Sequence, residues 1–171
     1  ILNMDEWKTF YNKISEISKY MEDSGVPLAY HHHMGTVVQS QEDTERLIDN
    51  TSDTVKLLID TGHMMYAGGD FVKIAKDYSS RLHHVHCKDI RKDVLDMSLK
   101  NDLSFIDAFF AGAFTVPGDG CINYENFLKS LKNLNYKGWL VVEAEQDPKK
   151  ANPFEYGKIG FNHLKKIALD C

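Results

Sequence analysis

Apolar residues follow two alternating patterns along the chain: helical spacing of three to four residues, and short continuous runs. Within residues 5–21, apolar side chains such as Trp7 and Ile14 recur at helical spacing, which predicts an amphipathic helix. The apolar run at 26–30 follows a glycine and leads into a histidine. A run of this length between turn signals is typical of a short buried strand.

The same two patterns continue to the end of the chain. They predict further helices at 40–50, 71–78, 103–110, 123–134 and 154–169, and further strands at 55–60, 82–87, 113–116 and 139–142. Asp70 and Asn123 can cap the helices that follow them. A first helix followed by five strand–helix units implies a parallel α/β fold.

The number of units leaves two architectures open. A doubly wound open sheet can hold five strands, whereas a barrel needs eight, so about three units would be missing before residue 1. No glycine-rich phosphate loop follows a strand, which weakens the doubly wound alternative. Because the chain starts at Ile1 and its front pattern is incomplete, we expect one domain over residues 1–171 that forms the C-terminal part of a (β/α)8 barrel.

Composition narrows the classes of partner. The chain is 43% hydrophobic and 26% charged, as in an ordinary globular domain. No apolar run approaches the roughly 20 residues that span a bilayer, and the first residues lack a signal-peptide pattern, so we expect no membrane partner. The net charge of −5 argues against a nucleic-acid partner. Acidic residues interrupt the basic stretch of Lys88, Arg91 and Lys92, which we interpret as a solvated loop with one useful lysine.

The cysteines indicate a reducing compartment. There are three, at positions 87, 121 and 171, and none is in a C-x-x-C spacing. An odd number without that spacing fits neither a disulfide framework nor a zinc knuckle. We therefore expect reduced thiols in a cytoplasmic protein.

Side chains that can bind metals or move protons follow four predicted strands, at the ends where β/α folds place their ligand sites. They are His31 and His33, Asp60 and His63, His86 and Lys88, and Glu143 and Glu145. Imidazoles and carboxylates together suit a borderline divalent ion such as Mn²⁺, Co²⁺, Fe²⁺ or Zn²⁺. Taken singly, a strand-end aspartate is more often a cap and a strand histidine more often structural. Their coincidence at four strand ends favours a metal or acid–base site.

The motifs that carry these residues resemble a known superfamily. Asp-Thr-Gly-His at 60–63 and His-x-Lys-Asp at 86–89 are similar to patterns of the xylose-isomerase-like barrels. His-His-His-Met-Gly-Thr at 31–36 and Glu-Ala-Glu-Gln-Asp-Pro at 143–148 are narrower and resemble the inosose dehydratases. The resemblance extends from about Met4 to the end of the chain.

This resemblance implies a ligand set for one divalent ion. The superfamily uses Glu, Asp, His and Glu from four strands, and the last three of these positions fall on Asp60, His86 and Glu143. The first position falls on His31, a departure from the pattern, so either His31 binds in place of the glutamate or water fills that position. His33 is the next candidate.

The resemblance also implies a reaction. Inosose dehydratases remove water from the polyol ketone 2-keto-myo-inositol to give a trihydroxycyclohexane-1,2-dione in inositol catabolism, and are associated with Mn²⁺ or Co²⁺ and with glutathione. The acid–base candidates are Glu145, His33 and His63. Lys88 would hold a substrate oxygen or tune His86, and Glu145 could equally orient a metal ligand.

Three alternatives stay open. A sugar isomerase or epimerase of the same superfamily would use the same metal and an enediolate. A DNA-repair endonuclease of the related barrel type would need several metal ions and a basic groove, which the acidic charge disfavours. A non-catalytic domain is the third, because an incomplete barrel exposes strand edges, which also makes a homo-oligomer compatible with the sequence.

Overall fold

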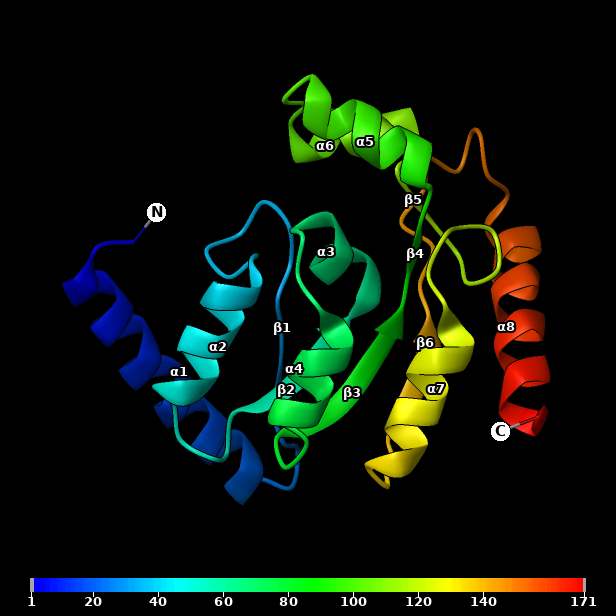
Figure 1. The fold of residues 1–171 in the computed structure, drawn as a ribbon. Helices are drawn as coiled ribbons and strands as arrows, with labels where there is room; N and C mark the ends of the chain where they lie inside the picture. The colour runs from blue at the N-terminus through cyan, green and yellow to red at the C-terminus, as the bar shows by residue number, and fades with distance from the viewer. Residues whose placement is uncertain (1, 171) are drawn as a thin grey trace.

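Four parallel strands form the centre of the molecule (Figure 1). The computed structural model describes residues 2–170, so the prediction for Cys171 lies outside the described residues. The parallel strands are β1 (Ala29–His31), β2 (Lys56–Asp60), β3 (Leu82–Cys87) and β6 (Trp139–Val142). The helices around them are α1 (Met4–Asp23), α2 (Gln41–Asp49), α3 (Thr61–Tyr66), α4 (Phe71–Asp77), α7 (Tyr124–Asn133) and α8 (Pro153–Asp170).

The strand order distinguishes between the two predicted architectures. The strands lie side by side in the order β1-β2-β3-β6, which is their order along the chain. A doubly wound sheet reverses its order at a switch point, whereas consecutive neighbours all running one way are what a barrel wall requires. The predicted fold class, a barrel-type parallel α/β arrangement, is therefore confirmed.

The helices pack against one face of this sheet and form the main core. Leu57, Ile59 and Val85 point to that face and are fully buried together with Phe127 of α7. Burying an aliphatic or aromatic side chain of this size contributes roughly 1.5–3 kcal/mol. Because side chains alternate along a strand, Asp60, which follows Ile59, points to the opposite face.

Helix starts agree with the sequence prediction. Asp70 accepts hydrogen bonds from the first turn of α4, and Asn123 accepts one from the first turn of α7. Ser40 and Asp43 form a reciprocal capping box at the start of α2. These caps fix where each helix leaves its strand, which in turn fixes the loops that follow the strands.

The fourth predicted strand, at 113–116, does not join the parallel sheet, so the prediction of five parallel units was wrong in this detail. β5 (Phe114–Thr115) pairs antiparallel with β4 (Asp89–Ile90) in a separate two-stranded sheet. Between them the chain forms α5 (Lys92–Lys100) and α6 (Phe105–Ala111), which Figure 1 shows standing above the C-terminal ends of the parallel strands. Residues 88–116 thus form an inserted segment that covers the C-terminal end of the sheet.

The basic stretch predicted as a solvated loop is largely ordered and partly buried. Lys88 is fully buried. Arg91 forms an ion pair with Asp119 at 2.6 Å and donates to the Gly112 carbonyl. Of the three basic residues only Lys92 is exposed, and it forms an ion pair with Asp96 one turn later in α5. The contacts of Lys88 and Arg91 therefore help to hold this inserted segment in place.

Two further predictions concern the cysteines and the length of apolar segments. Cys87 is buried and Cys121 is exposed, and both are free thiols. No helix within residues 2–170 combines the length and apolar character needed to cross a bilayer.

Candidate functional site

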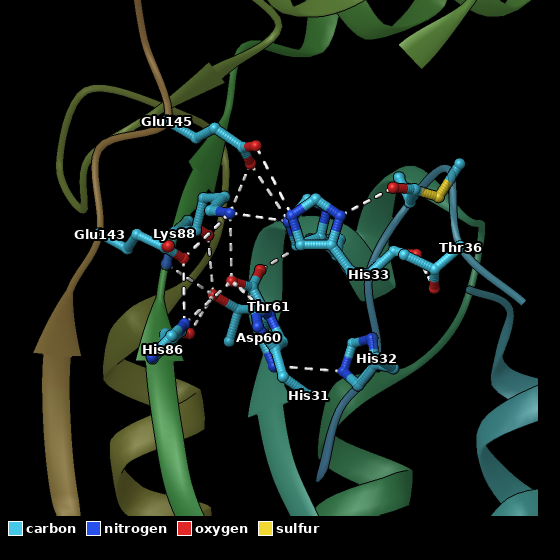
Figure 2. A network of polar contacts seen from close by, with 12 residues as sticks. His31, His32, His33, Thr36, Asp60, Thr61, His86, Lys88, Glu143 and Glu145 are labelled. Atoms are coloured by element: carbon cyan, nitrogen blue, oxygen red, sulfur yellow. Dashed lines mark hydrogen bonds and ion pairs between the residues drawn. The ribbon is translucent and has the colours of Figure 1, made fainter. Parts of the chain in front are cut away.

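Four side chains from four parallel strands meet at the C-terminal end of the sheet (Figure 2). They are His31 of β1, Asp60 of β2, His86 of β3 and Glu143, which follows β6. Each offers one ligand atom, and these four atoms lie within 4.8 Å of one another. We call this set the four-ligand group. It is the set that the resemblance implied.

The ligand atoms of this group share a feature: they are buried and, among the described residues, they make close ion-pair contacts but no hydrogen bond. They are His31 Nε2, Asp60 Oδ2, His86 Nδ1 and Glu143 Oε2. His86 Nδ1 lies 3.0 Å from Glu143 Oε2, and Asp60 Oδ2 lies 3.6 Å from His31 Nε2 and 3.7 Å from His86 Nδ1. Four such atoms aimed at one point, two of them on carboxylates, fit a divalent cation, which would satisfy all four together.

The electrostatics of the group agree with this donor set. Burial raises the pKa of Asp60, but His31, His86 and Lys88 more than offset it and hold that pKa well below its usual value. Burial likewise lowers the pKa of His86, but Asp60 and Glu143 raise it to about 9. The carboxylates therefore stay ionised and draw positive charge to this place.

The Asp-Thr-Gly-His motif builds the turn from β2 into α3, and each residue has its own role. Asp60 caps α3 through Oδ1, which accepts from His63 N–H at 2.8 Å, and Oδ2 remains for the four-ligand group. Thr61 Oγ1 donates to the Lys88 carbonyl at 2.7 Å and accepts from the Lys88 N–H at 3.1 Å. A Cβ on Gly62 would lie 2.7 Å from Lys88 Cγ, so only glycine leaves room for the lysine.

Lys88 connects the four-ligand group to a second set of residues. Its Nζ lies 3.3 Å from Asp60 Oδ2, 3.0 Å from Glu143 Oε2 and 2.6 Å from Glu145 Oε2. Burial lowers its pKa, but the three carboxylates more than compensate and the pKa rises. Lys88 is therefore a buried ammonium that neutralises part of the acidic charge. Its side chain is fully buried, so its polar contacts are with these carboxylates and with His63.

The second set, which we call the acid–base group, consists of His33, His63 and Glu145. Their ligand-type atoms also lie close enough to hold an ion. However, Lys88 Nζ lies closer to this set, at 2.8 Å from His63 Nε2 and 2.6 Å from Glu145 Oε2, than to the four-ligand group, where its distances are 3.0 and 3.3 Å, so the ammonium neutralises this set more directly. The arrangement is therefore better suited to moving protons than to a second metal ion.

Burial separates the members of the acid–base group. The side chains of His33 and Glu145 are 27% and 22% exposed, whereas that of His63 is fully buried. Contact with Glu145 raises the pKa of His33, and burial lowers that of His63. Burial raises the pKa of Glu145, but His33, His63 and Lys88 outweigh this and lower it. His33 and Glu145 are thus the members that a small molecule could reach.

All of the site residues named from the sequence lie at this end of the sheet, and the structure adds two that sequence reasoning missed. Phe105 of α6 packs its ring 5.4 Å from that of His33 and 5.9 Å from that of His63. Its position on an amphipathic surface helix gave no sign of this. His32 lies behind the site and is fully buried.

Asp89 completes the His-x-Lys-Asp motif but has a structural role. Its fully buried carboxylate accepts backbone hydrogen bonds from Ile90, Gly118 and Ile122. A side chain on Gly120 would collide with it. Asp89 therefore holds the loop after β5 in place and does not reach the four-ligand group.

Curated relatives match almost the whole chain. A rhizopine catabolism protein, MocC, of Rhizobium meliloti is 46% identical over 98% of this chain and 51% of its own length. An inosose dehydratase of Clostridium beijerinckii is 45% identical over 96% of this chain and 55% of its own length. The chain thus spans about half the length of the curated relatives that it matches.

Solved structures share the fold at low sequence identity. The probable 3-DHS dehydratase AsbF of Bacillus anthracis matches with a TM-score of 0.74 at 15% identity, over 98% of this chain and 58% of that one. The IOLI protein with a bound zinc atom matches with a TM-score of 0.66 at 21% identity, over 99% of this chain and 57% of that one. An L-ribulose 3-epimerase matches with a TM-score of 0.68 at 15% identity, over 99% of this chain and 57% of that one.

A family model settles the classification. It describes the xylose isomerase-like TIM barrel and matches residues 3–167. The four strands in chain order and the ligand-type side chains at their C-terminal ends are what such a barrel segment would place there. The chain belongs to the xylose isomerase-like TIM barrel family.

Proposed function

We propose that this chain carries the metal-binding and acid–base residues of a hydro-lyase that removes water from 2-keto-myo-inositol. The observation that supports this most is the convergence of four buried ligand atoms, which make no hydrogen bond with the described residues, in the four-ligand group. Identity of 45% to an inosose dehydratase supports the choice of substrate. Inositol catabolism and a cytoplasmic location follow from the same proposal.

Asp60, His86, Glu143 and His31 would hold one divalent ion, with Mn²⁺ or Co²⁺ proposed from the family resemblance. When bound, such an ion supplies Lewis acidity for the negative charge that develops when a proton next to a ketone leaves. Asp60 and Glu143 bring the negative charge that attracts the ion, and the two histidines bring nitrogen ligands, His86 after its proton has been displaced.

The acid–base group would move the protons. Glu145 is an ionised carboxylate that a substrate can reach, so it is placed to take the proton next to the ketone. His33, His63 and Lys88 lower its pKa, however, and so weaken it as a base. His33 has a raised pKa and lies 3.6 Å from Glu145, so it can protonate the leaving hydroxyl. Glu145 could instead orient its neighbours, with His33 as the base. His63 and Lys88 lie behind Glu145 and hold its charge and orientation.

The test is the mass of the product. The full-length protein, loaded with Mn²⁺ and incubated with 2-keto-myo-inositol, should give a product that has lost one water by mass spectrometry. Removal of Mn²⁺ with a chelator should stop the reaction. Parallel reactions with and without glutathione test the dependence implied by the family resemblance.

An epimerase or isomerase is the second candidate, favoured by the shared scaffold with the L-ribulose 3-epimerase. It would give a product of unchanged mass, and that result would replace the dehydratase proposal. A homo-oligomer is also proposed, and light scattering of the full-length protein would test it.

A further inference from the structure

His32 lies in the chain between two residues of the site but belongs to neither of its two groups. His31 belongs to the four-ligand group and His33 to the acid–base group. The ring of His32 is fully buried. The proposed reaction assigns this ring no role.

The ring of His32 accepts a backbone hydrogen bond that a main-chain carbonyl of β1 would otherwise accept. At the start of the pairing between β1 and β2, Lys56 N–H donates to the Leu28 carbonyl at 2.9 Å. Parallel strands repeat such bonds at every second residue, so the amide of Asp60 falls on a later rung. β1 ends at His31, and there His32 Nε2 accepts the Asp60 N–H at 3.2 Å (Figure 2).

This bond leaves Asp60 held from two directions. Its amide is anchored to His32, and its Oδ1 is anchored to the His63 N–H. Only Oδ2 remains, and it lies 3.6 Å from His31 Nε2 and 3.7 Å from His86 Nδ1. The place of Oδ2 in the four-ligand group therefore depends on both anchors.

We infer that His32 is a positioning residue, a neutral imidazole whose Nε2 fixes the Asp60 amide and thereby aims Asp60 Oδ2 into the four-ligand group. The inference rests on the proposed metal site for its effect on affinity, while the hydrogen bond itself is independent of any ion. His32 also ties β1 to β2 between the two histidines that belong to the site.

The energetic argument excludes simple filling of space. Since Nε2 accepts, the proton of the neutral ring is on Nδ1. His32 Nδ1 is buried and has no partner among residues 2–170. A leucine or methionine would fill the same volume without an unpartnered polar atom, so the imidazole is accounted for by the bond that Nε2 makes.

The variants His32→Gln and His32→Asn form a matched test. A glutamine amide reaches the position of Nε2, whereas an asparagine amide reaches only that of Nδ1. In the full-length protein we expect His32→Asn to weaken Mn²⁺ binding, measured by calorimetry, by about 10–100-fold, as for other groups that orient a ligand. His32→Gln should restore most of the affinity. Equal affinities of the two variants would overturn the inference, because a space-filling role does not distinguish them.

A measurement on the unaltered, metal-free protein separates this inference from the proposed function. NMR should show a scalar coupling between the Asp60 amide nitrogen and His32 Nε2, and a ring protonated on Nδ1. A ring protonated on Nε2 would overturn the inference even if Mn²⁺ binds. The expected coupling in a protein that fails to bind Mn²⁺ would support the His32 contact and refute the metal site.

Discussion

At the scale of single residues, the two carboxylate oxygens of Asp60 have different surroundings. Its side chain is fully buried, Oδ1 caps a helix, and Oδ2 has no hydrogen-bond partner. The two oxygens therefore have separable roles, one in the fold and one in the four-ligand group. A substitution that keeps Oδ1 and replaces Oδ2 tests the second role alone.

Asp60→Asn is that substitution. Asparagine caps helices about as well as aspartate, so we expect the full-length variant to remain folded by circular dichroism. Its amide nitrogen cannot bind a cation, so Mn²⁺ affinity should fall by more than about 100-fold, beyond the loss typical of residues that only orient a ligand. Asp60→Ala, which removes the cap as well, is the control that should also lose stability. Unchanged Mn²⁺ affinity in Asp60→Asn would refute the ligand assignment.

Gly62 is constrained by its neighbour. Because a Cβ there would lie within 3 Å of three carbons of the buried Lys88 side chain, Gly62→Ala should overpack the site and cost about 1–3 kcal/mol in urea unfolding. It should also lower activity, since Lys88 contacts the carboxylates of both groups. Gly157→Ala is the matched control. It lies in α8 with open space around it, and it should stabilise by up to about 1 kcal/mol.

At the scale of helices and strands, the elements that face the core were predictable. The periodicity identified α1 and α7 because their apolar residues lie on one buried side, with Trp7 and Phe127 fully or almost fully buried. The same reasoning missed α5. Two of its apolar residues, Met97 and Leu99, are 39% and 57% exposed, so the apolar positions of this helix do not mark one face.

The elements at the end of the sheet could not be predicted from local pattern. α3 is six residues long and begins immediately after β2, so it offers too few positions for a periodicity. β4 and β5 have two residues each, too few for a pattern, and they lie beside one another through their antiparallel pairing and the contact of Arg91 with the Phe114 carbonyl. The convergence of the strand-end side chains was predictable because parallel strands place their C-terminal ends together. The positions of Phe105 and His32 depend on tertiary contacts.

The link between α3, β3 and α7 is a set of buried hydroxyl contacts. Thr61 Oγ1 and Tyr124 Oη lie 2.7 Å apart, and Tyr124 Oη donates to the Lys88 carbonyl at 3.0 Å. Thr61→Val should cost about 1–3 kcal/mol, because it leaves buried groups unpaired. Tyr124→Phe should cost less in denaturant unfolding. The double variant should deviate from additivity by more than about 0.5 kcal/mol, since the two side chains share one network. Strict additivity would show that the contact contributes nothing of its own.

At the scale of the whole molecule, the four strands of the sheet are joined at their C-terminal ends by a site rather than by packing alone. Each strand contributes one member to the four-ligand group. The face opposite the helices carries Trp139, which is 76% exposed in this chain. Curated relatives are about twice as long, and in a closed family barrel this face would line the interior.

A metal that binds residues from all four strands should stabilise the fold as a whole. A ligand that binds the native but not the unfolded state adds about 2.7 kcal/mol at one hundred times its dissociation constant. Mn²⁺ should therefore raise the unfolding free energy of the full-length protein by about this amount, with a dependence on free Mn²⁺ that a chelator reverses. Asp60→Asn should show almost none of this gain. An equal gain in that variant would mean that the ion stabilises the protein from another place, and that the four-ligand group does not hold it.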